Sequence, residues 1–253
     1  REKLQRLPLD SASDGQAVFI SQILYDMDSR SALPVILDMV GTRGSFFKKG
    51  AIELLDQSNL NQANFVELCE RGLDDAEPMV REAAAGALLN FVRRDAGGSP
   101  EKIASILNSL YARLDELELE DQTQLLILLF QHGSLEQQSN AQSILNQWLE
   151  FAVKSGGRSD ESAHTLSSGL IVLVEVERLR LKSLHGSGFE NNPATRRKVN
   201  EEPSRLKDMV ADLLEHPSSQ IHQRLIPALV RQCKYIHWDD EYWAVQSLVK
   251  LLE

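Results

Sequence analysis

The stretch Leu68–Phe91, LCERGLDDAEPMVREAAAGALLNF, contains two amphipathic helical patterns that meet at an acidic turn marked by Pro78. Apolar residues recur on both sides of the turn at spacings of three and four, which place them on one face of each helix. These residues are Cys69, Leu73, Val80, Ala84, Leu88 and Phe91. One helix pair cannot bury such a face alone, so the pattern predicts that the pair stacks on neighbouring pairs.

The same spacing recurs along almost the whole chain, whereas runs of strict alternation rich in Val, Ile and Thr are missing from the sequence. The sequence therefore predicts an all-α fold of about twelve helices, or about six helix pairs of the usual repeat length. The clearest of the expected helices are Met79–Val92, Asp121–Gln131, Gln137–Val153, Ser162–Leu184, Leu206–Leu214, Ile221–Cys233 and Asp240–Leu252.

Polar residues and prolines indicate where several helices begin. Ser99 followed by Pro100 is typical of a helix cap and a first helical residue. Ser31 is expected to precede another helix, with Pro34 in its first turn. Asp14 precedes a helix whose apolar residues are Val18, Phe19, Ile23, Leu24 and Met27.

The unit around Pro78 resembles the HEAT repeat, which is an antiparallel helix pair. Asp75 lies in the turn and Arg81 follows at the start of the second helix, as in the HEAT pattern. The resemblance implies a right-handed α-solenoid of roughly five to six helix pairs, with residues 1–253 as a single array. It also implies an inter-repeat structural ladder in which Asp75 and Arg81 link adjacent units, because a carboxylate and a guanidinium can pair in a fork geometry.

Two further segments can be aligned with this unit, and both keep its apolar positions but lose the acid and the arginine. The first segment has Thr42, Phe47, Lys48, Ala51 and Leu55, and the second has His216, Ile221, His222, Leu225 and Leu229. No copy between Pro100 and Leu184 aligns in this way. The resemblance therefore covers about a third of the chain, and armadillo or another helical-pair repeat is the alternative.

Composition and charge narrow the class of protein. The 253 residues are 42% hydrophobic and 25% charged, which is ordinary for a folded protein. The net charge of -10, from 27 basic and 37 acidic side chains, disfavours nucleic acid as a partner unless a local basic surface exists. No run of eighteen apolar residues predicts a membrane span.

Cysteine usage and the chain ends give two further expectations. Cys69 and Cys233 lie far apart in apolar helical patterns, so buried free thiols and a cytoplasmic setting are expected. The chain starts at Arg1, and an apolar stripe continues to its end at Glu253. We therefore expect a fragment of a longer protein.

Motifs for chemistry are absent from the sequence. It contains no His-Glu-x-x-His, no cysteine-histidine cluster and no Gly-x-Ser-x-Gly, so no metal, cofactor or catalytic residue is predicted. His216 and His222 are six residues apart, and a structural role is favoured over a metal site. The segment 237–243 concentrates aromatic and acidic residues, and packing of Trp243 in the core is favoured over a binding hot spot.

The longest interruption of the helical pattern is Gly186–Pro203, which is expected to be a flexible insertion loop. It contains the basic run Arg196, Arg197 and Lys198, which is a candidate partner-binding site in an acidic protein. Solvated linker charge is the favoured interpretation of this run, because three charges fall short of the usual basic patch.

These observations favour a noncatalytic scaffold or adaptor whose concave face binds another protein, as an extended peptide or a helix. The alternatives are an enzyme or nucleic-acid-binding protein on the same fold, similar to DNA glycosylases or to pigment lyases, and a spacer arm of a larger protein. The sequence does not identify the partner.

Overall fold

The computed structural model describes residues 12–57, 63–94, 99–156, 159–185, 197, 199–201, 203–235 and 240–252. Within these ranges the regular structure is helical and contains no strand, which confirms the predicted all-α class. The chain divides into two compact units, 1–121 and 122–253. That residues 1–253 form a single array stays a prediction. No helix in the described ranges is both long enough and apolar enough to cross a membrane.

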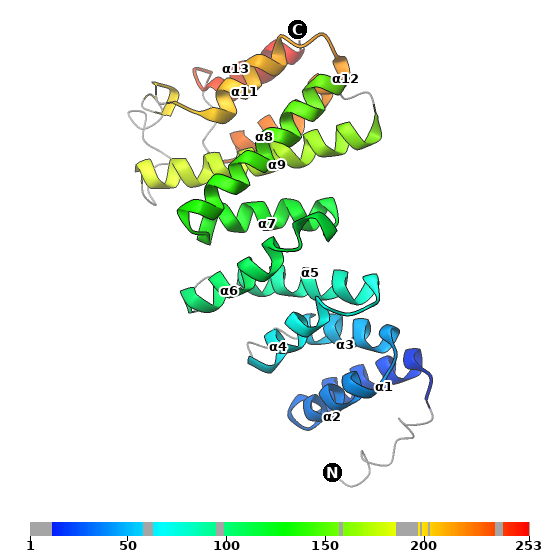
Figure 1. Ribbon diagram of the computed structural model, residues 1–253. Helices are drawn as coiled ribbons and strands as arrows, with labels where there is room; N and C mark the ends of the chain where they lie inside the picture. Colours follow the sequence, from blue (N-terminus) through cyan, green and yellow to red (C-terminus); the bar gives the residue numbers. More distant parts are fainter. Residues whose placement is uncertain are drawn as a thin grey trace. The chain divides into compact units, whose positions relative to one another are not determined.

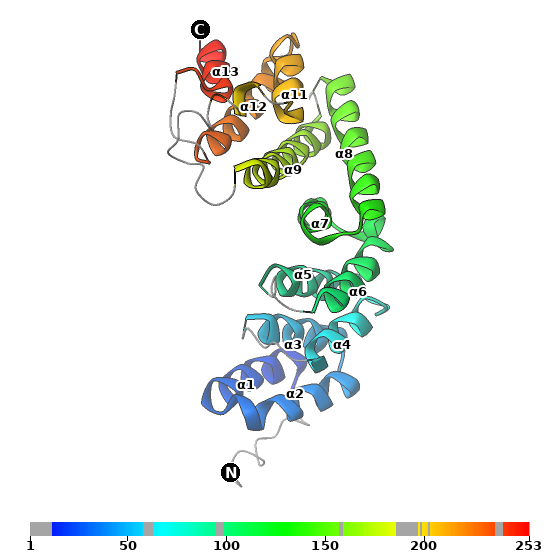
Figure 2. The same ribbon diagram turned by 90° about the vertical axis from the view of Figure 1, so that its left-hand side faces the viewer.

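The first unit contains helices that pack on their neighbours along the chain (Figure 1). They are α1 (Asp14–Met27), α2 (Ser29–Thr42), α3 (Ser45–Gln57), α4 (Ala63–Gly72), α5 (Pro78–Arg94), α6 (Pro100–Tyr111) and the short 3-10 helix η2 (Leu114–Glu116). Helix α3 packs on both α1 and α5, and α4 packs on α5. Figure 2 shows α1, α3 and α5 following one another in one row, with α2, α4 and α6 in a second.

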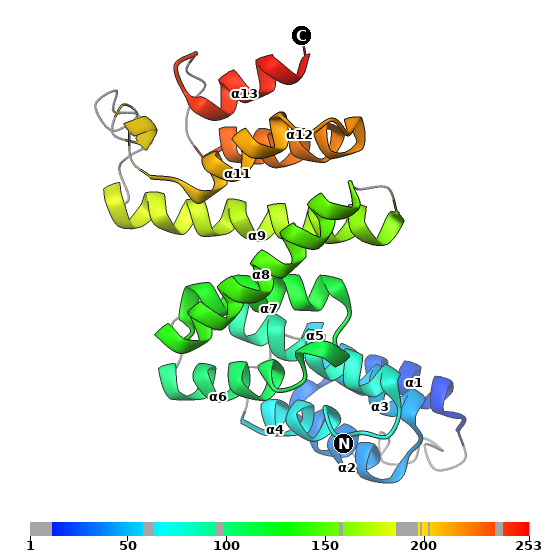
Figure 3. The same cartoon turned by 45° about the horizontal axis from the view of Figure 1, so that its top comes forward.

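The second unit also consists of helices that pack on one another (Figure 3). They are α8 (Leu135–Ser155), α9 (Asp160–His185), α11 (Arg205–Leu214), α12 (Ser219–Cys233) and α13 (Trp243–Leu252), and α7 (Leu119–His132) spans the boundary between the units. Helix α9 packs on α8, α11 and α12, and α12 packs on α13. The core between these helices includes the aliphatic residues Leu145, Leu166, Val172, Leu225 and Leu229.

The helix pair that dominates the sequence pattern is α4 and α5. Ala84 and Leu88 are fully buried and Phe91 is nearly so, as their spacing predicts. A Cβ atom placed on Gly72, at the end of α4, would lie only 2.9 Å from the Cβ atom of Ala84. The two helices therefore meet at a point where only glycine fits without rearrangement.

The helix start predicted at Ser99 is confirmed, and those predicted at Asp14 and Ser31 are corrected. Asp14 does not precede α1 but is its first residue, and Ser13 caps the helix. Ser99 caps α6 and Pro100 is its first residue. Helix α2 instead begins at Ser29 and is capped by Asp28, because the Asp28 carboxylate accepts hydrogen bonds from both the N–H and the hydroxyl of Ser31. Ser31 is thus inside the helix, and Pro34 lies beyond its first turn.

The predicted apolar residues of α1 are only partly buried. Leu24 is buried, but Phe19, Ile23 and Met27 are exposed by 66%, 43% and 67%. The difference arises because α2 and α3, the helices of this unit that pack on α1, cover its Ala17 and Leu24 face.

The segment 186–203 is described only at 197, 199–201 and 203, and the other residues of the predicted loop lie outside the described ranges. Positions 197 and 199–201 are helical, and Val199 is fully buried. This part of the segment therefore differs from the flexible loop that its breaker residues predict.

Candidate functional site

Asp75, one of the two predicted ladder residues, links the turn before α5 to helix α3. Its Oδ2 atom accepts a hydrogen bond of 2.8 Å from Lys48 Nζ, and its Oδ1 atom accepts one of 3.0 Å from the Glu77 N–H. The bond from Lys48 holds the pKa of the Asp75 carboxyl below its ordinary value, with a further contribution from the Glu77 N–H. The carboxylate therefore acts as a fixed link within the first unit.

The side chain of Arg81, the other ladder residue, binds backbone carbonyls of the same turn. Its Nη1 atom donates to the carbonyls of Asp75 and Ala76 at 2.9 Å each. Its Nε atom also lies 3.9 Å from Glu116 Oε2, in the connection between α6 and α7. Asp75 and Arg81 thus lie close together. The Asp75 carboxylate, however, pairs with Lys48 and not with the Arg81 guanidinium.

Further polar links join neighbouring helices of the first unit. Arg113 forms an ion pair with Asp74. Asp56, near the end of α3, accepts hydrogen bonds from Asn90 at 2.8 Å and from Arg94 at 2.6 Å, and both donors belong to α5. These contacts fix the register of successive helices, which is a structural role.

The structure describes only one position of the candidate partner-binding run 196–198. Arg196 and Lys198 lie outside the described residues. Arg197 is exposed, and its Nε atom lies 3.0 Å from Glu201 Oε1, one helical turn further on. The charge of Arg197 is therefore partly neutralised within its own segment, and a partner-binding role for the run stays a prediction.

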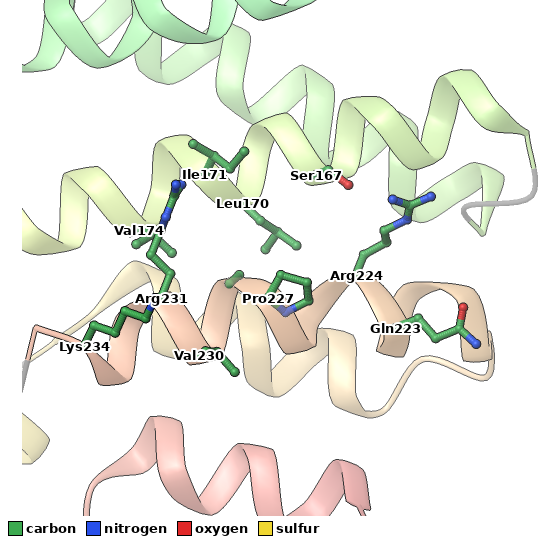
Figure 4. A pocket seen from close by; sticks show the side chains of 11 residues that line it. Ser167, Leu170, Ile171, Val174, Gln223, Arg224, Pro227, Val230, Arg231 and Lys234 are labelled. Atoms are coloured by element: carbon green, nitrogen blue, oxygen red, sulfur yellow. The ribbon is translucent and has the colours of Figure 1, made fainter. Parts of the chain in front are cut away.

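A groove of about 630 Å³ lies between α9 and α12 in the second unit. Figure 4 shows the side chains that line it. From α9 the lining residues are Ser167, Leu170, Ile171 and Val174, and from α12 they include Arg224, Pro227, Val230 and Arg231, with Lys234 immediately after the helix. We refer to this feature as the α9–α12 groove.

The α9–α12 groove has an apolar floor. Leu170 and Val174 are buried at its base, whereas Ile171 is partly accessible and Pro227 is exposed. Val230 adds an apolar side chain that is 38% exposed. An accessible apolar strip beside polar groups is the usual composition of a binding surface.

Three cations border this floor. Figure 4 shows Arg224 and Arg231 extending from α12 toward α9, on either side of Leu170 and Pro227. Lys234 lies at the Arg231 end of the groove. All three side chains are exposed.

A second hollow, of about 400 Å³, lies in the first unit among α2, α3, α4 and α5. Its charged groups are already neutralised, because Lys48 pairs with Asp75 and Arg71 pairs with Glu67. A third hollow, between α5 and the start of α7, measures only about 30 Å³. The α9–α12 groove is therefore the strongest candidate for a binding site in the described part of the chain.

The described residues contain no group of three or more His, Cys, Asp or Glu side chains that could hold a metal ion. His216 Nδ1 accepts a hydrogen bond of 3.2 Å from the Ser218 N–H, and Nε2 of His222 is buried. Cys69 and Cys233 are buried free thiols, as predicted, and burial raises the pKa of both.

The aromatic segment near the end of the chain belongs to the core. Tyr242 is fully buried and Trp243 is 5% exposed, which confirms the predicted packing of Trp243. The Tyr242 hydroxyl accepts a hydrogen bond of 3.0 Å from Gln232 Nε2 on α12. These side chains support α12 from the core side. Residues 236–239 lie outside the described ranges.

The sequence analysis missed the α9–α12 groove, although a signal for it exists. Residues 219–234 carry Arg224, Arg231 and Lys234 but no acidic residue, in a chain with 37 acidic side chains. The apolar face that borders these cations on α9 comes from residues 167–174, more than forty positions earlier. Only the packing of α9 on α12 brings the two together.

Comparison of the chain with protein-family models, curated proteins and solved structures gives no match. The interpretation as HEAT-like repeats therefore rests on the residue pattern of 68–91 and on the packing of helices within each unit.

Proposed function

We propose that this protein is a noncatalytic protein-binding module made of stacked helix pairs of the HEAT type. The observation that carries the proposal is the α9–α12 groove, where an accessible apolar floor lies beside exposed cations. Protein-binding surfaces typically combine an apolar centre with a charged rim, and helical repeats present such surfaces between successive helix pairs.

Packing within each unit supports the same proposal. Each helix contacts helices close to it in the chain, such as α3 with α1 and α5, and α12 with α9 and α13. Hydrogen bonds such as that from Lys48 to Asp75 then fix adjacent helices to each other. A scaffold built in this way holds surface residues from several helices in constant positions, which is what recognition of a partner requires.

The experiment that tests the proposal is selection of ligands from a random-peptide display library with the immobilised full chain. Recovered peptides are then titrated in solution by fluorescence anisotropy. We expect peptides that bind with a dissociation constant of about 1 to 100 µM. The proposal is contradicted if no peptide binds this chain more tightly than it binds an unrelated helical protein. It is also contradicted if a duplex oligonucleotide binds the chain more tightly than every peptide does.

A further inference from the structure

The cations of the α9–α12 groove have no acidic partner within the described structure. Arg224, Arg231 and Lys234 form no ion pair with any described residue, whereas Arg178 and Arg180 on the facing helix pair with Glu175 and Glu177. The positive charge of α12 is thus available to a ligand, in a chain whose net charge is -10. Uncompensated charge of one sign at a groove attracts partners of the opposite sign.

The spacing of the cations fits an extended peptide. Arg224 and Arg231 are seven residues apart on α12, so about 10 Å of helix separates them. An extended chain advances about 3.3 Å per residue, so acidic side chains about three residues apart match this distance. The apolar floor formed by Ile171 and Pro227 lies between the two arginines, where an intervening apolar side chain can be buried.

We propose that the α9–α12 groove binds an extended acidic segment of another protein, with an apolar side chain on its floor and flanking carboxylates on Arg224 and Arg231. Arginine suits this role because its planar guanidinium binds a carboxylate through two hydrogen bonds. Lys234 extends the positive rim for a further acid. This inference rests on the proposed function and adds the chemistry of the partner.

A protein segment fits the groove better than a nucleic acid does. No aromatic side chain lines the groove, so it lacks the stacking surfaces on which single-stranded bases bind. A duplex would require a longer row of cations than three, and the acidic excess of the chain opposes a polyanion. The accessible apolar residues Ile171, Pro227 and Val230 suit an apolar side chain instead.

The test uses the full chain and a fluorescein-labelled peptide of sequence Gly-Asp-Glu-Leu-Leu-Asp-Glu-Gly, titrated by fluorescence anisotropy. We expect saturable binding that weakens on the order of tenfold or more in the double variant Arg224→Glu, Arg231→Glu, because two attractions become repulsions. Val230→Ser should weaken binding by removing part of the apolar floor. A peptide with Asn and Gln in place of its acids should bind more weakly by a similar factor.

The control is Lys154→Glu, which makes the charge reversal of one arginine substitution at an exposed residue of α8 that does not line the groove. It should leave the affinity within about twofold of the wild type, since exposed charges at a distance are screened. Circular dichroism should show that all variants keep their helices. If charge reversal unfolds the chain, Arg224→Gln with Arg231→Gln replaces it, and the expected loss is smaller but in the same direction.

The outcomes separate this inference from the proposed function. Library peptides that bind the chain but are not acidic, or that bind the double arginine variant equally well, would overturn the acidic-segment inference and leave the protein-binding function standing. Binding of an oligonucleotide that competes with the acidic peptide and is lost in the same variant would overturn the inference in favour of nucleic acid. If no peptide binds the chain, both the acidic-segment inference and the proposed protein-binding function are wrong.

Discussion

Lys48 Nζ lies 2.8 Å from Asp75 Oδ2, and this hydrogen bond joins helix α3 to the turn that precedes α5. Lys48 occupies, in its own helix, the position that the repeat alignment gives to Arg81 in α5. Arg81 in turn lies 3.9 Å from Glu116, in the connection that follows α6. In both cases a cation near the start of one helix lies close to an acid in the turn of the next helix pair, which is the arrangement that the predicted inter-repeat ladder requires.

The Lys48–Asp75 link should contribute measurably to stability. In a double-mutant cycle with Lys48→Met and Asp75→Asn, we expect a coupling free energy of about 0.5 to 1 kcal/mol, because the pair is only partly accessible. Urea unfolding followed by circular dichroism provides the measurement. The exposed pair Lys154–Glu150 serves as a control, with an expected coupling of about 0.3 kcal/mol. A coupling for Lys48 and Asp75 no larger than this control would argue against the ladder.

The hydrogen bond between Lys48 and Asp75 also predicts that the stability of the protein depends on pH. The pKa of Asp75 is lowered in the folded protein, mainly by the hydrogen bond from Lys48. Its contribution to stability is therefore fully present above the unfolded pKa of about 3.9 and is lost as the pH falls through the folded pKa. The stability difference between the wild type and Asp75→Asn should shrink below about pH 4. NMR titration of the carboxyl carbon should give a lowered pKa that rises in Lys48→Met, and an ordinary pKa in the wild type would refute this.

Two glycines should respond in opposite directions to alanine. Gly72→Ala places a Cβ atom 2.9 Å from Ala84 Cβ and 3.3 Å from Ile52 Cδ1, so we expect a loss of about 1 to 3 kcal/mol from overpacking. Gly86 lies inside α5, and a Cβ atom there meets no atom within 4 Å. Gly86→Ala should therefore stabilise the protein by about 0.5 to 1 kcal/mol through helix propensity. A melting temperature of Gly72→Ala no lower than that of the wild type would show that α4 and α5 do not pack this closely at Gly72.

The two cysteines should resist modification in the folded protein. Cys69 is fully buried and Cys233 is 2% exposed, and burial raises the pKa of both thiols, so little thiolate is present. Reaction with a disulfide reagent near neutral pH should be slow in buffer and fast in urea, as followed by mass spectrometry. Rapid labelling of Cys69 without denaturant would mean that the packing of α4 on α5 opens readily.

The hydrogen bond from Gln232 to Tyr242, on the core side of α12, should contribute measurably to stability. Tyr242→Phe removes the acceptor of Gln232 Nε2 in a fully buried setting, and we expect a loss of about 1 to 2 kcal/mol. Tyr25→Phe is the control, because the Tyr25 side chain is only partly buried and its hydroxyl has no hydrogen bond to a described residue. Equal stability of the two variants would show that the Gln232–Tyr242 bond contributes nothing.

The fold class was predictable because helical periodicity is a local property of the sequence. The spacing of Ala84 and Leu88 places them on the buried face of their helix, whichever helix packs against that face. Ser99 and Pro100 start a helix through local hydrogen bonding and backbone geometry alone. Phe19 and Met27 show the limit of this approach, since an apolar side chain is buried only where another helix covers it. Which helix covers which face depends on the tertiary structure, and the apolar spacing within α1 does not specify it.

The candidate site was less predictable for the same reason. The alignment correctly placed Asp75 in the turn and Arg81 at the start of the second helix. The partner of Asp75, however, is Lys48, which the alignment places at the position of the missing arginine. The α9–α12 groove combines residues from two helices separated by a long segment, so periodicity alone could not join them. The absence of acids from residues 219–234 was visible in the sequence and is the signal to search for in similar chains.

Hydrogen exchange of the full chain, with and without a selected peptide ligand, tests the central claim most directly. The account predicts slower exchange in the presence of the peptide along 167–174 and 223–234, the segments that line the α9–α12 groove, and little change in α1 to α6. Peptide binding that leaves exchange in both segments unchanged would contradict the account, because the ligand would then bind elsewhere.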